Sequence, residues 1–71
     1  MVAKSQIILY MYDMLINNNK IVMDEVIALF GISIRTFRRY ISEINSFLYN
    51  NYKNQQIKYD NVNLYYKISS R

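Results

Sequence analysis

Gly31 is the only glycine in the chain, and it separates two segments whose apolar residues recur with the spacing of a helix. A left-handed residue commonly closes a helix, and glycine adopts that conformation without steric cost. We therefore predict that a helix of about residues 24–30 ends at Gly31. Ser33 is a favourable N-cap residue only two positions later, so a longer helix of about residues 33–49 is expected to begin there.

The residues before this turn predict a first helix and a short extended segment. A helix of about residues 5–17 follows from its apolar spacing, with Ser5 as the expected N-cap. The asparagines at 17–19 are poor residues for a helix interior and are expected to end it. Residues 20–23 are partly β-branched and are expected to be extended, and Asp24 is the predicted N-cap of the next helix.

The residues after the turn predict a long amphipathic helix and a β-hairpin. Apolar residues spaced four, three and four apart lie on one face of the long helix: Phe37, Ile41, Ile44 and Leu48. Residues 56–69 alternate around the turn-forming residues 60–63, which indicates a hairpin. In its second strand, Leu64, Tyr66 and Ile68 alternate with Tyr65 and Lys67. The chain, residues 1–71, is expected to be one domain of the α+β class, mainly α with a small β-hairpin.

The composition disfavours several classes of function. The chain has no cysteine and no histidine, which removes disulfides, thiolate metal sites and the usual acid–base group near neutral pH. It has no glycine-rich phosphate loop and its five acidic residues are scattered, so we expect neither enzymatic activity nor a cofactor or metal. No apolar run approaches the roughly 20 residues that span a bilayer, and no signal peptide is evident. We therefore expect a cytoplasmic protein with no membrane partner.

Part of the positive charge lies beside an apolar helix face. The net charge is +4, which favours an anionic partner such as nucleic acid. Arg35, Arg38 and Arg39 fall between the core residues of the helix that begins at Ser33, so they are expected to point away from the core. Two helices joined by a short glycine-containing turn form a helix-turn-helix, whose second helix enters the DNA major groove. The alternative is a solvated helix face in which one arginine pairs with Glu43.

Each polar residue at the start of that helix has a chemical reason to contact DNA. Arginine can bind the O6 and N7 atoms of guanine with two hydrogen bonds, and its planar fork also binds phosphate. Hydroxyl groups, together with the free N–H groups of a helix start, suit a phosphate oxygen. We therefore predict DNA contacts from Ser33, Arg35, Thr36, Arg38 and Arg39.

The stretch Gly-Ile-Ser-Ile-Arg-Thr-Phe-Arg-Arg-Tyr-Ile, from Gly31 to Ile41, resembles the turn and recognition helix of the winged helix-turn-helix domains in DeoR-type and WYL-type bacterial transcription regulators. The matching positions are Ser33, Arg35, Thr36 and Arg39. The resemblance covers about residues 20–68, and it implies three helices plus a C-terminal wing and sequence-specific binding of double-stranded DNA by a transcription regulator. Tyr40 stands where those domains usually carry an acid, and Ile27 stands where many helix-turn-helix units carry alanine.

The predicted hairpin corresponds to the wing of that fold. Lys58 and Lys67 are expected to face outward along it, and Asn61 and Asn63 are expected at its tip. These four residues are predicted to meet the DNA backbone or the minor groove next to the recognition helix. An ordinary solvated hairpin is the alternative for all four.

The first helix has more apolar residues than one core face can absorb. One interpretation is that Tyr10, Met14 and their neighbours form the interface of a homodimer that reads a two-fold DNA site. Half-exposed tyrosines and methionines on a monomer are the alternative. A second class of function also stays open, in which the winged helix is a protein–protein adaptor of a phage or plasmid type and binds through this helix. A DNA-binding protein of replication or packaging would show the same features.

Overall fold

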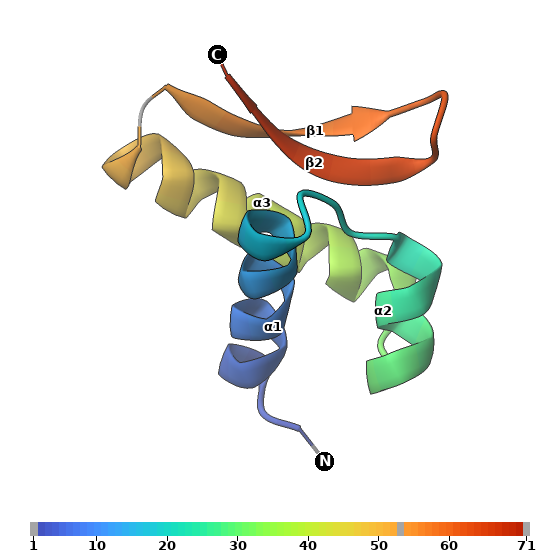
Figure 1. Cartoon of the computed structure of the whole chain (residues 1–71). Coiled ribbons are helices and arrows are strands. Elements are labelled where there is room, and N and C mark those ends of the chain that lie inside the picture. The colour runs from blue at the N-terminus through green and yellow to red at the C-terminus, as the bar shows by residue number, and fades with distance from the viewer. Residues whose placement is uncertain (1, 53, 71) are drawn as a thin grey trace.

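The computed structural model describes residues 2–52 and 54–70, and within them it contains three helices followed by a two-stranded antiparallel sheet. The elements in chain order are α1 (Lys4–Asn17), α2 (Met23–Phe30), α3 (Ile34–Asn51), β1 (Gln55–Asp60) and β2 (Tyr65–Ser70) (Figure 1). The predicted α+β class, mainly helical with a C-terminal hairpin, is confirmed. The limits of the predicted domain, Met1 and Arg71, lie outside the described residues.

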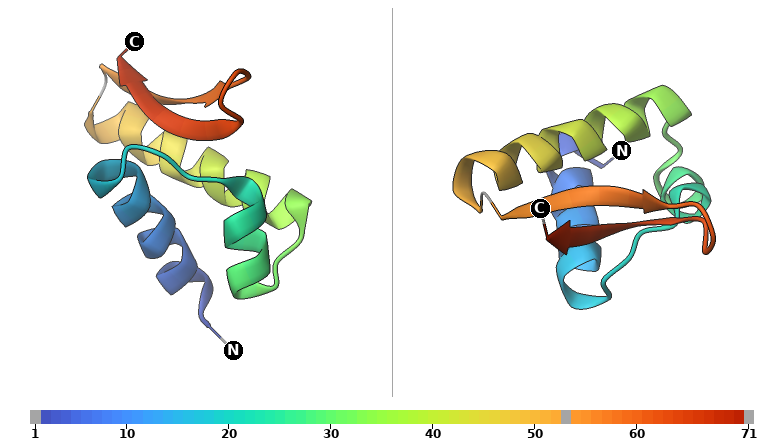
Figure 2. Two further views of the ribbon diagram at one scale, coloured as in Figure 1. Left: turned by 45° about the vertical axis from the view of Figure 1, so that its right-hand side comes forward. Right: turned by 90° about the horizontal axis from the view of Figure 1, so that it is seen from above.

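The hairpin covers one side of a layer of three helices. Figure 1 shows β1 and β2 above the helices, and the view from above in Figure 2 shows β1 alongside α3 and running in the opposite direction. α2 packs against α3, and α1 packs against both α3 and β2. The structure therefore has the layout of a winged helix-turn-helix, with α2 and α3 as the two helices of the motif and the hairpin as the wing.

One apolar core joins the helices to the wing. Its buried members are Ile7, Met11, Leu15, Ile21, Val26, Phe37, Tyr40, Ile44 and Leu48. The predicted inward face of α3 is therefore confirmed at Phe37, Ile44 and Leu48, while Ile41 packs against the core half-buried. The ring of Phe37 is fully buried and its centroid lies 5.4 Å from that of Tyr66 on β2, so the core extends from the helices to the wing.

The turn between α2 and α3 has the predicted geometry. Gly31 closes α2 in the left-handed conformation, with φ 65° and ψ 33°, and its N–H donates to the carbonyl of Ile27. Ser33 is the N-cap of α3, and its hydroxyl oxygen accepts the N–H of Thr36 at 3.0 Å. The short turn therefore depends on one residue that tolerates positive φ and one whose side chain satisfies a helix N–H group.

Two predicted N-caps are wrong. α1 begins one residue earlier than expected and Ala3 precedes it, so Ser5 lies inside the first turn. α2 begins at Met23 after Val22, so Asp24 lies in its first turn rather than at its cap. Neither Ala3 nor Val22 makes a side-chain cap. Carboxylates in a first turn still interact favourably with the helix dipole, so Asp24 keeps an electrostatic role.

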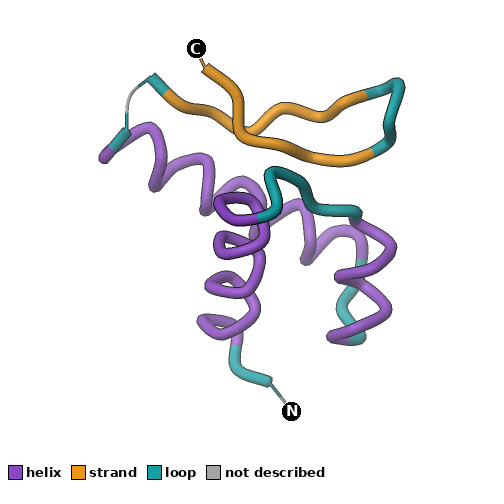
Figure 3. Tube along the Cα trace, in the orientation of Figure 1, coloured by secondary structure: helices purple, strands orange, loops and turns teal. Residues whose placement is uncertain are grey.

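The segment between α1 and α2 is tied to the wing by its backbone. Ile21 forms an antiparallel bridge with Tyr66, in which each N–H donates to the other residue's carbonyl at 2.8 Å. Figure 3 shows this loop passing next to β2. The prediction of an extended segment at 20–23 is therefore confirmed at Ile21, whereas Met23 already belongs to α2. Because Val22 is still extended next to this bridge, α2 begins only at Met23.

The hairpin has one departure from its predicted pattern. β1 and β2 pair in register from Gln55 opposite Ser70 to Asp60 opposite Tyr65, which leaves residues 61–64 as a four-residue turn. Leu64 was predicted to lie within the second strand, but it is the last residue of this turn, with φ 64°. Its N–H donates to the carbonyl of Asp60 at 2.7 Å, so closing the turn requires a left-handed residue at this position.

Candidate nucleic-acid interface

Three arginines form the exposed face of the first two turns of α3. Arg35, Arg38 and Arg39 are all exposed, whereas Phe37 between them is fully buried. Because successive residues of a helix are about 100° apart, the three arginines cover an arc of about 100° opposite the core. Within residues 2–52 and 54–70 none of them forms an ion pair. All three guanidinium groups are therefore accessible to an anionic ligand.

The alternative ion pair between an arginine and Glu43 is not formed in the described part of the chain. Glu43 instead pairs with Lys4 of α1, with 3.3 Å between Nζ and Oε2. Both side chains are about half exposed, so this pair adds little stability. Its effect on the interface is electrostatic, because it places the only acid of α3 beside a lysine of α1.

Tyr40 is a core residue at the position where the domains of DeoR-type and WYL-type regulators usually carry an acid. It is 8% exposed and belongs to the core, and Lys4 Nζ lies 5.9 Å from the centre of its ring. Arg39 is next to it in the chain but points outward. Its neighbour is therefore a packed aromatic residue in place of a countercharge.

Ser33 and Thr36 are joined to each other at the start of α3. The Ser33 hydroxyl donates to Thr36 Oγ1 at 3.0 Å while its oxygen accepts the Thr36 N–H. The Thr36 hydroxyl therefore keeps its own hydrogen for a further acceptor, whereas Ser33 is used mainly as a cap. The N–H groups of Ile34 and Arg35 have no acceptor within a helix that starts at Ile34, which suits a phosphate oxygen.

The turn of the wing lies level with the arginines. The Ile57 N–H donates to Asn45 Oδ1 at 3.0 Å, which fixes β1 against α3. Arg38 precedes Asn45 by two turns, so it lies on the same side of α3, about 10 Å nearer the helix start. From Ile57, β1 continues for three residues, or about 10 Å, towards that same end and reaches Asp60. The arginines and the wing turn therefore belong to one end of the molecule.

Two predicted lysines lie directly opposite each other on the outer face of the wing. Lys58 and Lys67 are cross-strand partners, and they alternate with Ile57, Tyr66 and Ile68, which pack against the core. Lys67 Nζ lies 3.8 Å from Asp60 Oδ2, so its charge is partly compensated. Like charges at directly opposite positions destabilise a sheet. The pair therefore concentrates positive charge at some cost to the wing itself.

Lys20 extends this pair, and sequence analysis did not include it. Because Ile21 and Tyr66 pair antiparallel, the preceding residue comes opposite Lys67. Lys20 Nζ lies 5.6 Å from the centre of the Tyr65 ring, which agrees with a place on the outer face. Lys20, Lys67 and Lys58 thus form a row across the wing, here called the lysine row. No local pattern marks Lys20, because its place depends on a bridge to a residue far along the chain.

The two asparagines at the tip have different roles. Asn63 is exposed, but its side-chain amide donates to Asp60 Oδ2 at 3.0 Å and its backbone N–H donates to Oδ1. Val62 N–H donates to the same Oδ1. The N–H and side-chain amide of Asn63 lower the pKa of Asp60, with smaller contributions from Val62 and Lys67, while partial burial opposes them. Asn63 therefore holds the turn together, and Asn61 lies exposed beside it.

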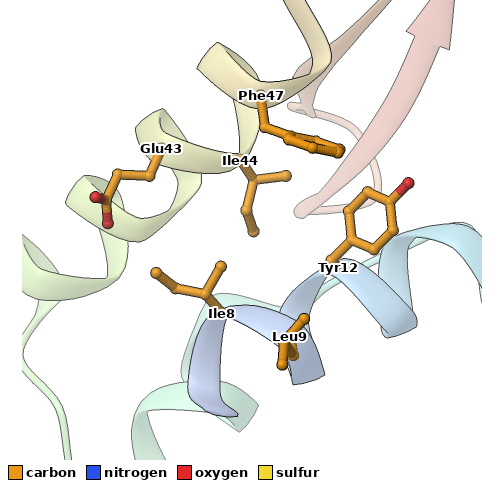
Figure 4. Close-up of a pocket in the computed structure, with 6 residues that line it drawn as sticks. All are labelled: Ile8, Leu9, Tyr12, Glu43, Ile44 and Phe47. Carbon is orange, nitrogen blue, oxygen red and sulfur yellow. The ribbon is translucent and has the colours of Figure 1, made fainter. Parts of the chain in front are cut away.

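Tyr10 and Met14, the residues predicted for self-association, are half-buried and packed against the core. Tyr10 makes an edge-to-face contact with Phe30, with ring centres 5.1 Å apart. An apolar groove of about 290 Å³ lies instead on the other side of α1, between α1 and α3, and neither Tyr10 nor Met14 lines it. Its lining is Ile8, Leu9, Tyr12, Glu43, Ile44 and Phe47 (Figure 4). The Glu43 carboxylate is turned away from the apolar side chains in this view, so the floor of the groove is apolar.

The sequence matches no protein-family model, and no curated protein or solved structure is significantly similar to the chain. No helix in the described ranges is both long and apolar enough to cross a membrane.

Proposed function

We propose that this protein binds double-stranded DNA, with the first two turns of α3 in the major groove and the wing on the adjacent backbone or minor groove. The observation that carries the proposal is the group of exposed arginines Arg35, Arg38 and Arg39 on the side of α3 opposite Phe37, which form no ion pair with any residue that the structure describes. A role as a sequence-specific transcription regulator is what the resemblance to DeoR-type and WYL-type domains adds to this interface.

The chemistry of the proposed interface divides between specificity and affinity. An arginine in the major groove reads guanine through two hydrogen bonds, each such pair giving about 1–3 kcal/mol of discrimination. Lysines and helix N–H groups contact phosphates, which orient the protein but carry no sequence information. We therefore assign base reading to the arginine face of α3, and backbone contacts to Thr36 and to the lysine row.

The test is fluorescence anisotropy of a labelled random duplex titrated with the protein at several salt concentrations. Binding is expected to weaken steeply as salt rises, by about 0.9 log units per log unit of salt for each phosphate neutralised. The double variant Arg35→Ala/Arg39→Ala should bind more weakly and with a shallower slope. The double variant Lys4→Ala/Glu43→Ala removes the ion pair between α1 and α3 without changing the net charge and is the control, with a small change expected. Binding that is absent at low salt, or indifferent to both arginines, contradicts the proposal.

A second comparison separates base reading from simple charge. The double variant Arg35→Lys/Arg39→Lys keeps the charge but loses the planar, two-bond geometry. On a selected binding site we expect it to lose most of its preference over random DNA while retaining binding to the random duplex. If the parent and this variant prefer the selected site over random DNA to the same degree, the two arginines contact phosphates and not bases.

The apolar groove between α1 and α3 favours a second candidate function, which is a protein contact in the manner of a winged-helix adaptor or a homodimer. Leu9 and Phe47 present exposed apolar surface there. Charge reversal, Arg35→Glu/Arg39→Glu, distinguishes the two functions, because it should abolish DNA binding and leave a partner bound at the groove. A monomer mass that stays constant from micromolar concentration upward in sedimentation would exclude the homodimer.

A further inference from the structure

Two exposed apolar side chains lie at the tip of the wing, and one of them, Leu64, also borders a hollow at the start of α2. Val62 is 87% exposed, which is the largest value among the large apolar residues described, and Leu64 is 63% exposed. They lie in the four-residue turn beside Asn61 and Asn63. A polar residue at either position would remove this apolar surface from solvent contact without affecting the core. Solvation of the turn therefore does not explain why residues 62 and 64 are apolar.

The backbone at Leu64 makes the choice of leucine more unusual. Its φ of 64° is a left-handed conformation that glycine and asparagine adopt readily and that leucine adopts rarely. The turn holds this geometry through Asp60, whose carbonyl accepts the Leu64 N–H and whose carboxylate accepts the N–H groups of Val62 and Asn63. Residues kept in sparsely populated conformations are concentrated at functional sites. The tip is thus a firmly held turn that presents two apolar side chains.

The positive charge next to the tip indicates that a partner contacting this turn carries negative charge. Lys58 and Lys67 lie two residues back from the strand ends Asp60 and Tyr65 that flank the turn, in the lysine row that Lys20 completes. With strands about 4.8 Å apart, the row covers roughly 10 Å, over which a DNA duplex presents roughly six phosphate charges. An apolar partner protein would gain nothing from such a row, whereas a nucleic acid offers a charged backbone beside an apolar base stack.

We propose that Val62 and Leu64 form an apolar wedge that enters the DNA minor groove next to the site of α3 and bends the duplex. This inference rests on the proposed DNA binding and adds its mode. Apolar side chains that enter the minor groove partly unstack a base step and kink the duplex by roughly 20–90°. The lysine row would hold phosphates behind the entry point, and the wing turn lies level with Arg38 along α3.

The experiment is a titration of a duplex that carries a donor and an acceptor dye at its two ends, with anisotropy read in the same samples. At saturation, the protein is expected to shorten the distance between the two dyes as much as a duplex bend of at least roughly 20° would. The variant Leu64→Asn suits the left-handed backbone, so its Tm should equal or exceed that of the parent. It should nevertheless bind about tenfold more weakly and bend the duplex less, and Val62→Ser should act in the same direction. The control is Leu29→Asn, in which a leucine of α2 with 59% exposure is changed far along the chain from the tip.

The outcomes separate the wedge from the binding on which it rests. Normal binding with no bend, or a bend that Leu64→Asn and Val62→Ser leave unchanged, overturns the wedge and leaves DNA binding in place. Loss of binding in Leu29→Asn to the same degree as in Leu64→Asn also overturns it, because the effect would then belong to apolar surface in general. Anisotropy that stays flat for the unmodified protein overturns both proposals together.

Discussion

Asn45 and Ile57 connect the recognition helix to the wing through one hydrogen bond. The Ile57 N–H, at the third residue of β1, donates to the Asn45 side-chain oxygen in the middle of α3 at 3.0 Å. The bond is partly buried, and Asn45 lies on the same side of α3 as Arg38. It therefore sets how far along α3 the wing lies, and with it the distance between the wing tip and the arginines.

Changing Asn45 to alanine should loosen the wing. The Ile57 N–H would lose its acceptor in a partly buried place, which costs about 1–3 kcal/mol when no water replaces it. We expect the free energy of unfolding in urea to fall by about 1 kcal/mol and DNA affinity to fall with it. The variant Asn45→Asp keeps an acceptor oxygen and is the control. If both variants are equally stable, the hydrogen bond does not position the wing.

Gly31 should be sensitive to substitution for a purely conformational reason. Its φ is 65°, and a side chain built at its Cα would meet nothing within 4 Å. Steric clash with neighbours is thus absent, and the cost of alanine is the left-handed backbone itself, about 1–2 kcal/mol. For a chain of this length we expect Tm to fall by roughly 4–8 °C per kcal/mol. Gly31→Asn should lose clearly less, because asparagine tolerates this conformation, and an equal loss would mean that the turn needs glycine for another reason.

Much of this architecture could be predicted from local sequence, because it depends on local chemistry. Gly31 and Ser33 mark the end of one helix and the start of the next through their own backbone and side-chain preferences. The spacing of Phe37, Ile44 and Leu48 gives the buried face of α3, and by exclusion it gives the outward direction of the arginines. The predicted caps at Ser5 and Asp24 failed because a good cap residue need not be used.

The features that sequence could not reveal depend on contacts between distant residues. Lys20 joins the lysine row only because Ile21 bridges Tyr66, 45 positions later. Leu64 continues the alternation of β2 in the sequence, but the register of the hairpin places it in the turn. Asn63 reads as a free tip residue, yet its amide is bonded to Asp60. A period of two in the sequence does not say where a strand ends.

The wing should lose stability in acid through Asp60. The N–H and side-chain amide of Asn63, followed by Val62 N–H and Lys67, hold the pKa of Asp60 below its usual value of about 3.8. A carboxyl with a lowered folded-state pKa stabilises the fold above the unfolded-state value, and this stabilisation is lost as the pH falls through the folded-state value. We expect the parent to be more stable than Asp60→Asn above about pH 5, and the difference to shrink below about pH 4. A difference that stays constant down to about pH 2 would show that the charge of Asp60 is irrelevant.

The lysine row should affect protein stability and DNA binding in opposite directions. Lys58 faces Lys67 directly, so Lys58→Gln should raise the free energy of unfolding by a few tenths of a kcal/mol. The same change removes a phosphate contact, so the salt dependence of DNA binding should become shallower by about 0.9. Lys20→Gln should reduce the slope in the same way, and the loss of affinity should be equal for every DNA sequence because phosphates carry no sequence information.

The control for the lysine row is Lys4→Gln, which removes the same charge from α1, where Lys4 pairs with Glu43. Its salt slope should change by much less than that of Lys20→Gln or Lys58→Gln, although all three variants alter the net charge equally. A general effect of net charge would make the three slopes equal, and a solvated wing would leave the slopes of Lys20→Gln and Lys58→Gln unchanged. Lys20 and Lys4 are both exposed lysines outside the recognition helix, but only Lys20 lies on the outer face of the wing, so a larger change of slope in Lys20→Gln would assign the phosphate contact to that face.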